Sequence, residues 1–386
     1  MDIADLRIAL FSGNYNMTTD GANRALNRLV GYLVRNGAQV HVYSPTTKAP
    51  AFEPQGELVS LPSVAIPFRT EYRFSMGLSG GALRDLERFS PNIMHVSAPD
   101  VAAHRALKWA RKQAIPVVAS VHTRFETYAR YYGLGFTEPL IEGIMRRFYQ
   151  RCDALVAPSE SFIDVLRQQQ MNDDISLWTR GVDRDVFDPV RRDMGWRRSV
   201  GIADDDLAVG FLGRLVMEKG LDVVAATIKE LERRNIGCKV LVVGDGPARE
   251  WFAKAMPAAR FVGFQSGVDL GRAVASMDVL FNPSVTETFG NVTLEAMACG
   301  VPVVAAHAAG SANLVQDGAS GRLVAPGDIP AFANALQAYA VDSDLRAAHG
   351  KAGLEGARAF DWDAINQTVA DTYLRLIESA KGKARS

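Results

Sequence analysis

Two glutamates frame the segment of this chain that is best suited to chemistry. Glu287 and Glu295 flank the triplet Phe289-Gly290-Asn291, and the apolar run that follows predicts a helix. A helix that starts at Gly290 would offer free backbone N–H groups and a positive dipole end to a diphosphate. If most of the span were helical, the carboxylates would lie ~12 Å apart, at a rise of ~1.5 Å per residue. That separation suits two hydroxyl-binding groups on one long ligand and excludes an acid/base pair on one bond.

A second cluster could supply the positive charge that such a ligand needs. The apolar stretch that begins at Leu207 ends in Gly213-Arg214, and Lys219 follows shortly after. A glycine at the end of a strand lets the backbone approach a ligand, while the guanidinium binds phosphate oxygens in a fork. Taken alone, Arg214 and Lys219 would be ordinary surface cations. Together with the two glutamates, they predict a nucleotide diphosphate site.

Apolar strands alternate with helical patterns along the chain, which predicts an α/β fold with parallel sheets and right-handed crossovers. The expected strands of the first half lie near 6–11, 39–43, 57–61, 92–96, 116–122, 153–158 and 175–178. Those of the second half lie near 207–212, 239–243, 259–263, 279–283, 301–305 and 321–324. A chain of 386 residues exceeds one usual core, and turn formers over 179–189 predict the linker between two domains.

Open α/β sheets bind ligands beyond the C-terminal ends of their strands, and three segments of the first half should reach such an edge. In the first, Asp20-Gly21 precedes a helix expected over 23–36. Gly21 could let the backbone approach a phosphate or sugar, or Asp20 could simply cap the helix. The second segment ends in His122, which could serve a sugar pocket or be a satisfied structural histidine.

The third segment, from Arg124 to Arg151, interleaves arginines with aromatic residues. This pattern suits a surface that takes an amphiphile or touches anionic headgroups. A solvated helix with aromatic anchors in the core would show the same pattern. The residues expected to bind the acceptor are Arg124, Tyr128, Tyr131 and Tyr132.

Composition excludes several classes of protein. The 43 Lys and Arg residues balance the 43 Asp and Glu residues, so bulk charge signals neither nucleic acid nor an anionic membrane. Three isolated cysteines without a CxxC pair predict a reducing compartment and small core residues. Neither a signal peptide nor an apolar stretch of the ~20 residues that span a membrane is evident. The expectation is a cytoplasmic protein, at most peripheral to a membrane.

Taken in order, these pieces resemble the retaining glycosyltransferases of family 4. The resemblance covers essentially the whole chain and rests on Gly213-Arg214 with Lys219, Gly244-Asp245-Gly246-Pro247, Phe261-Val262-Gly263, Pro283-Ser284 and the pair Glu287 and Glu295. It implies the GT-B architecture, in which two Rossmann-like parallel-sheet domains face a central cleft. The implied domains are an acceptor-binding domain at 1–178, a linker and nucleotide-sugar-binding domain at 179–360, and a helix at 361–386 that crosses back to the first.

The same resemblance implies roles for individual residues. Arg214 and Lys219 would neutralise the leaving diphosphate, Glu287 would bind sugar hydroxyls, and Glu295 would bind the ribose diol. The catalytic set is Arg214, Lys219, Glu287 and His122, and the donor-binding set is Gly21, Gly213, Gly246, Phe264, Thr288, Phe289, Gly290, Asn291 and Glu295. The chain departs from the family where Asp20 replaces a usual glycine, and where Ala309-Gly310-Ser311-Ala312-Asn313 replaces a usual Gly-Gly-x-Pro-Glu loop.

The implied reaction moves mannose, glucose or a hexuronic acid from a GDP- or UDP-linked sugar to a membrane lipid. Diacylglycerol, phosphatidylinositol and ceramide are the expected acceptors, as in similar bacterial α-mannosyltransferases and sulfoquinovosyl-diacylglycerol synthases, at an anionic membrane surface. A retaining hydrolase needs two carboxyl groups about 5 Å apart, so front-face displacement is favoured. No metal or other cofactor is expected, and Asp361-Trp362-Asp363 is interpreted as a helix cap.

Two other activities fit the same residues. A transferase of polysaccharide assembly would use a soluble or lipid-linked glycan as its acceptor. A sugar-nucleotide epimerase of the same fold could lack an acceptor surface and would release free sugar and nucleotide. A non-enzymatic binding scaffold would not need the cations Arg214 and Lys219, which are present.

Overall fold

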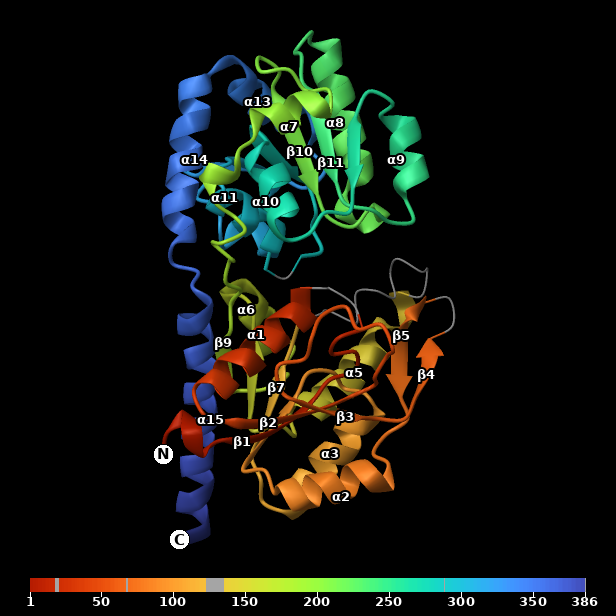
Figure 1. The fold of residues 1–386 in the computed structure, drawn as a ribbon, viewed down its shortest axis with the longest axis vertical. Helices are drawn as coiled ribbons and strands as arrows, with labels where there is room; N and C mark the ends of the chain where they lie inside the picture. Colours follow the sequence, from red (N-terminus) through yellow and green to blue (C-terminus); the bar gives the residue numbers. More distant parts are fainter. Residues whose placement is uncertain (18–20, 67–68, 123–134, 288, 386) are drawn as a thin grey trace. The chain divides into compact units, whose positions relative to one another are not determined.

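The protein is described here by a computed structural model that covers residues 1–17, 21–66, 69–122, 135–287 and 289–385. The chain divides into two compact units. The first joins Met1–Arg180 to Trp362–Ser386, and the second is Gly181–Asp361. Each unit is built on its own parallel sheet with helices packed against it (Figure 1). The assignment of the acceptor to one unit and of the nucleotide sugar to the other stays a prediction.

The sheet of the first unit has seven parallel strands in the order β3-β2-β1-β6-β7-β8-β9. They are β1 (Arg7–Phe11), β2 (Gln39–Ser44), β3 (Glu57–Ser60), β6 (Ile93–Val96), β7 (Val117–Ser120), β8 (Ala154–Ala157) and β9 (Ile175–Leu177). Each of them overlaps a range expected from the sequence. Strands buried on both faces are nearly continuous apolar runs, which is why the pattern found them.

A separate antiparallel pair in this unit was missed. It consists of β4 (Ser63–Ile66) and β5 (Arg69–Ser75). Val64 pairs with Phe74 in this hairpin, and both side chains are exposed. Because this pair is not buried in a core, its sequence lacks the apolar run by which the other strands were recognised.

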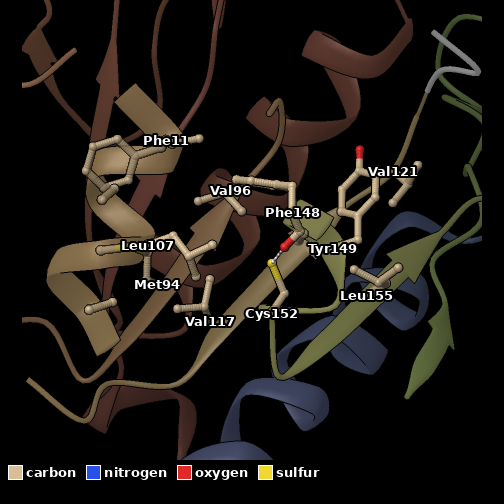
Figure 2. Close-up of a cluster of buried hydrophobic side chains, with 14 of the residues drawn as sticks. Phe11, Met94, Val96, Leu107, Val117, Val121, Phe148, Tyr149, Cys152 and Leu155 are labelled. Carbon is tan, nitrogen blue, oxygen red and sulfur yellow. Dashed lines mark hydrogen bonds between the residues drawn. The ribbon is translucent and has the colours of Figure 1, made fainter. Parts of the chain in front are cut away.

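Helices cover the sheet of the first unit. They are α1 (Gly21–Arg35), α2 (Gly80–Phe89), α3 (Val101–Lys112), α5 (Glu138–Tyr149), α6 (Glu160–Gln168) and α15 (Trp362–Arg385), with short 3-10 turns η1 (Ile3–Asp5) and η2 (Gly135–Thr137). Helices α2, α3, α5 and α6 share one buried cluster with alternate strand residues. Figure 2 shows part of it, where Phe148 of α5 lies with Met94, Val117 and Leu155 of three strands. Helix α15, from the end of the chain, packs instead against α1 and β9.

The sheet of the second unit has six parallel strands in the order β12-β11-β10-β13-β14-β15. They are β10 (Ala208–Leu212), β11 (Lys239–Val243), β12 (Arg260–Gly263), β13 (Val279–Asn282), β14 (Val303–Ala306) and β15 (Gly321–Val324), and each overlaps an expected range. The strand order reverses between β10 and β13. Open α/β sheets bind ligands at such a switch point.

Two buried clusters cover the opposite faces of this second sheet. Ala208 and Leu241 belong to one, while their neighbours Val209 and Val242 belong to the other, as the two-residue repeat of a strand requires. The helices are α7 (Met194–Ser199), α8 (Leu221–Arg233), α9 (Arg249–Ala255), α10 (Gly267–Ala275), α11 (Asn291–Ala298), α12 (Ala309–Ala312), α13 (Ile329–Val341) and α14 (Ser343–Ala357), with 3-10 turns η3 (Pro189–Arg191) and η4 (Met217–Lys219).

The three cysteines are free thiols that lie in or beside these cores. Cys152 and Cys299 are buried, and Cys238 is half-buried. Burial raises the pKa of Cys152 to about 12 and that of Cys238 to about 11, so both stay protonated at neutral pH. Among the helices of the described ranges, none has both the length and the apolar character of a membrane span.

Candidate active site

The loops that follow β10 and β13 meet at the switch point of the second sheet. Lys219 Nζ lies 2.9 Å from Glu287 Oε1 and joins the two loops by an ion pair. Lys219 is 28% exposed and Glu287 12% exposed, so the pair is partly shielded from solvent. A longer contact of 3.4 Å runs from Thr286 Oγ1 to the carbonyl oxygen of Glu218. The structure therefore brings together two residues that the sequence placed 68 positions apart.

Glycine is required where these two loops touch. Gly220 has a φ of +74°, and a Cβ atom there would lie 3.1 Å from Pro283 Cγ. A larger residue would push the Lys219 loop away from the Glu287 loop. The backbone thus sets the separation that the ion pair uses.

The Gly-Asp-Gly segment supports the Gly213-Arg214 loop from behind. The N–H of Gly213 donates to the carbonyl oxygen of Val243, at 3.0 Å. A Cβ atom on Gly244 would lie 2.0 Å from the Gly213 oxygen, and one on Gly246 would lie 2.5 Å from the Leu215 oxygen. Both glycines therefore allow close packing of two backbones. The predicted contact of Gly246 with the donor stays a prediction.

Gly213 has open space on the side where a Cβ atom would stand. Its φ of +145° favours glycine, and no heavy atom lies within 4 Å of the position that a Cβ atom would take. Arg214, the next residue, is exposed. Arg214 therefore lies on a backbone turn at the end of β10 that β11 and its loop hold in place.

The second loop leads into helix α11. Gly290 forms the N-cap with a φ of +95°, and the helix begins at Asn291. The helix thus starts at the residues expected from the sequence, and Glu287, Phe289 and Gly290 lie before it, so a rise of ~1.5 Å per residue applies only from Asn291 to Glu295. The ring of Phe289 is buried against Phe360, at a centroid distance of 5.8 Å. Only the backbone of Phe289 can face a ligand, since the side chain belongs to the core.

The segment that departs from the family pattern buttresses Glu287. A Cβ atom on Gly310 would lie 2.7 Å from Glu287 Cβ, and one on Gly290 would lie 2.4 Å from the Gly310 oxygen. The loop before α11 and the segment around Gly310 are thus closely packed against each other. The absence of the usual glutamate leaves this packing in place.

The remaining predicted donor residues occupy separate positions. Glu295 is half-buried in α11, and Phe264 follows β12 with 66% of its surface exposed. Gly21 begins α1 in the first unit. Thr288 and the predicted acceptor residues Arg124, Tyr128, Tyr131 and Tyr132 lie outside the described residues.

His122 lies two residues beyond β7 in the first unit, beside two residues that the sequence analysis did not assign to the site. Arg180 Nη2 lies 2.7 Å from His122 Nδ1, and the Trp178 ring meets the imidazole edge-on at 5.2 Å. Burial lowers the pKa of His122 well below 6.5, with further lowering by Arg180 and His95. The imidazole is therefore neutral at physiological pH. Trp178 ended an expected strand and Arg180 belonged to the predicted linker, so the local pattern did not indicate a site at either residue.

Comparisons with known proteins decide the family. Residues 19–186 match the family described as glycosyltransferase family 4, and residues 206–342 match that described as glycosyl transferases group 1. A sulfoquinovosyl transferase of Arabidopsis thaliana is 31% identical over 375 residues, which cover 94% of this chain and 72% of the relative. The chain belongs to glycosyltransferase family 4. The predicted family and the retaining class are thereby confirmed.

Two further similarities agree with membership of family 4. A GDP-mannose-dependent α-mannosyltransferase of Corynebacterium glutamicum is 28% identical over 381 residues, 97% of this chain and 90% of that one. The solved sucrose-phosphate synthase of Thermosynechococcus elongatus matches 96% of this chain and 99% of its own, with a TM-score of 0.79 at 21% identity. At this identity, the structural match shows only that the two proteins share a fold. Two parallel sheets and this match confirm the predicted GT-B fold.

Among the described residues of this glycosyltransferase, candidate metal ligands belong to a different unit from the switch point. In the described ranges, the only group of side chains with metal-ligand spacing is His41, Glu57 and Asp85, in the first unit. His41 Nε2 faces Glu57 at 3.2 Å, and Nδ1 faces Asp85 at 3.0 Å, so the two carboxylates use opposite ring nitrogens. Asp363 of the Asp-Trp-Asp triplet pairs with Arg35 at 2.8 Å. A metal-free mechanism stays a prediction.

Proposed function

We propose that this family 4 glycosyltransferase moves a hexose from a nucleotide diphosphate sugar to a membrane lipid. The sugar is mannose, glucose or a hexuronic acid, and the carrier is GDP or UDP. The name of the relative from Corynebacterium glutamicum supports GDP-mannose as the donor. The acceptor is a lipid such as diacylglycerol, phosphatidylinositol or ceramide, reached at the inner face of the cell membrane.

The donor chemistry is supported by the charges at the switch point. Departure of the sugar leaves negative charge on the diphosphate, and fixed cations are the main means of stabilising such charge. Arg214 and Lys219 supply it, while the backbone at Gly290 and Asn291 supplies N–H groups. Glu287 holds Lys219 in place and binds sugar hydroxyls, and Glu295 binds the ribose. The acceptor oxygen bonds to the anomeric carbon as the bond from that carbon to the phosphate oxygen breaks, and the hydroxyl proton passes to the leaving phosphate. Because attack and departure occur on the same side, the anomeric configuration is retained.

The main support for a lipid acceptor is an exposed apolar stripe on η2 and α5. Phe136, Leu140 and Ile144 are 79%, 69% and 49% exposed. Leu140 and Ile144 are four residues apart and lie on one side of α5, and Phe136 precedes them on η2. Arg147 and Arg151 follow and are also exposed. An apolar stripe beside basic residues suits a helix that lies on an anionic lipid surface.

A donor and acceptor screen tests this function. The protein is incubated with GDP-mannose, UDP-glucose and UDP-glucuronic acid, with and without vesicles that contain diacylglycerol, phosphatidylinositol or ceramide. We expect release of one nucleotide that depends on one lipid, with a glycolipid product detected by mass spectrometry. Transfer to a soluble glycan instead would indicate polysaccharide assembly. Release of free sugar and nucleotide without any acceptor would indicate an epimerase.

The same assay tests the absence of a metal. Because Arg214 and Lys219 supply the charge that magnesium would otherwise provide, activity should persist in excess EDTA. Loss of activity in EDTA that magnesium restores would reject this part of the proposal.

A further inference from the structure

We propose that Arg180 is a positioning residue that locks His122 in the neutral tautomer with its proton on Nε2. His122 can then only donate a hydrogen bond to the donor sugar and cannot accept its proton as a base. This inference rests on the proposed function and on the expectation, from the family resemblance, that His122 serves the sugar pocket. Both residues belong to the first unit.

The tautomer follows from the chemistry of arginine. A guanidinium has five N–H donors and no acceptor. Since Arg180 Nη2 lies 2.7 Å from His122 Nδ1, this nitrogen must accept through its lone pair. In a neutral imidazole one nitrogen donates and the other accepts, so the proton resides on Nε2. In a protonated imidazole, the Nδ1–H group would face the Nη2–H group of Arg180, and two donors cannot form a hydrogen bond.

Arg180 is itself held in place. It is buried, and Nη1 donates to the carbonyl oxygens of Trp178 and Thr179 at 2.7 and 3.0 Å. Its guanidinium carbon lies 4.8 Å from the centre of the Trp178 ring. Over the described part of the chain, no carboxylate forms a salt bridge with Arg180. Among the described residues, its charge therefore acts on His122 without an opposing carboxylate.

The C-terminal helix α15 anchors this arrangement. The fully buried Trp178 donates from Nε1 to Asn366 Oδ1 at 3.3 Å, and its ring also meets His95 edge-on. His95 in turn contacts Ser120 Oγ at 2.8 Å and the hydroxyl of Tyr373. Side chains of α15 thus fix the tryptophan on which the guanidinium rests. The position of Arg180 is set by packing and not by the ligand.

Nitrogen-15 NMR of histidine-labelled protein reads the tautomer directly. The chain has 6 histidines, and the signal of His122 is assigned by its loss in His122→Gln. We expect a proton on Nε2 and none on Nδ1 in the wild type and in Arg180→Lys, which keeps a donor. Arg180→Met should populate the form with the proton on Nδ1. Arg184→Met changes an exposed arginine of the predicted linker and should leave the His122 signal unchanged.

The kcat values of variants provide a second test. The amide nitrogen of glutamine comes near the place of Nε2, whereas that of asparagine comes near Nδ1. His122→Gln should therefore keep roughly tenfold more kcat than His122→Asn, the value of about one hydrogen bond. Arg180→Met should lower kcat and leave the Kd of the free nucleotide unchanged.

The two arms separate the inference from the function on which it rests. The proposal that Arg180 fixes the tautomer would be overturned in two cases, even if sugar is transferred. In the first, wild-type His122 carries its proton on Nδ1. In the second, the tautomer is unchanged in Arg180→Met. Equal kcat in His122→Gln and His122→Asn would also overturn the hydrogen-bond role. If the tautomer behaves as expected but no nucleotide sugar is consumed, the lock stands and the proposed function fails.

Discussion

At the scale of single residues, the switch point places two cations where a diphosphate would leave. Arg214 is exposed and Lys219 is only partly shielded from solvent, so neither side chain contributes to the packing of the core. Their charge matters most in the transition state, when the leaving group is most negative. Each should therefore affect kcat more than stability.

We predict that Arg214→Ala and Lys219→Ala each lower kcat about 10²- to 10³-fold, as the loss of one preorganised donor does elsewhere. Thermal unfolding followed by circular dichroism should be close to that of the wild type. Lys229→Ala removes an exposed lysine of α8 and serves as the control. Unchanged kcat in both site variants would remove these residues from the leaving group.

A second prediction concerns His95, which is fully buried between Ser120 and Tyr373. Burial lowers its pKa from 6.5 to about 3. The unfolded chain binds a proton below pH 6.5 while the folded chain does not, so this contribution to stability is complete above pH 6.5. It is lost as the pH falls toward 3, by at most about 1.4 kcal/mol per pH unit.

Urea unfolding between pH 7 and pH 5 measures this slope. His95→Gln should lower the free energy of unfolding at pH 7, but that free energy should then decrease less steeply as the pH falls. His307→Gln, at an exposed histidine, should leave the slope of the wild type intact. A slope equal to that of the wild type in His95→Gln would show that His95 does not carry the effect.

At the scale of elements, the loop after β11 shapes the loop after β10. Gly244 has a φ of +133°, and a Cβ atom there would lie 2.0 Å from the Gly213 oxygen. A backbone contact this close cannot be relieved by rotating a side chain. The Gly213-Arg214 turn would have to move, although the strands would not.

We therefore predict that Gly244→Ala raises the Kd of the nucleotide at least about tenfold, since positive-φ strain of ~1–3 kcal/mol is added to the displaced turn. Titration calorimetry with GDP and UDP measures this change. Gly237→Ala is the matched control, because no atom lies within 4 Å of its Cβ position. Normal nucleotide binding by Gly244→Ala would show that the turn is not required in its present form.

At the scale of the whole molecule, net charge cannot draw the protein to a membrane, because it is zero. Local charge on exposed arginines of α5 and of the residues just after it would have to do so. Arg146, expected in this surface, is partly engaged inside the unit, where Nε donates to the Gln169 oxygen at 2.7 Å. The exposed Arg147 and Arg151 are therefore the better residues to test.

We predict that Arg147→Glu with Arg151→Glu releases the protein from anionic vesicles and spares nucleotide binding. Wild-type binding should weaken as salt rises, because the screening length is near 10 Å at ~0.1 M. Arg84→Glu with Arg88→Glu makes the same charge change on exposed α2 of the same unit and should keep vesicle binding. Sedimentation with vesicles measures all three proteins. Equal loss in both double variants would assign the effect to bulk charge.

The strands of the two parallel sheets could be predicted from the sequence because apolar runs that end in turn formers mark them, as Leu207–Leu212 followed by Gly213 does. Runs of this kind are a local property of the chain, and so are the glycines with positive φ at Gly213 and Gly290. Local chemistry thus determined the fold class, the edge of the sheet that carries the candidate site, and the family resemblance.

Only the tertiary structure decided which of these residues meet. Lys219 reaches Glu287 because β10 and β13 are neighbours in the sheet, and Gly244 supports Gly213 because β11 lies on the other side of β10. The contact of Arg180 with His122 likewise needs β7 and the end of the first unit to come together. Contacts between distant segments depend on strand order and packing, which no local pattern of residue types encodes.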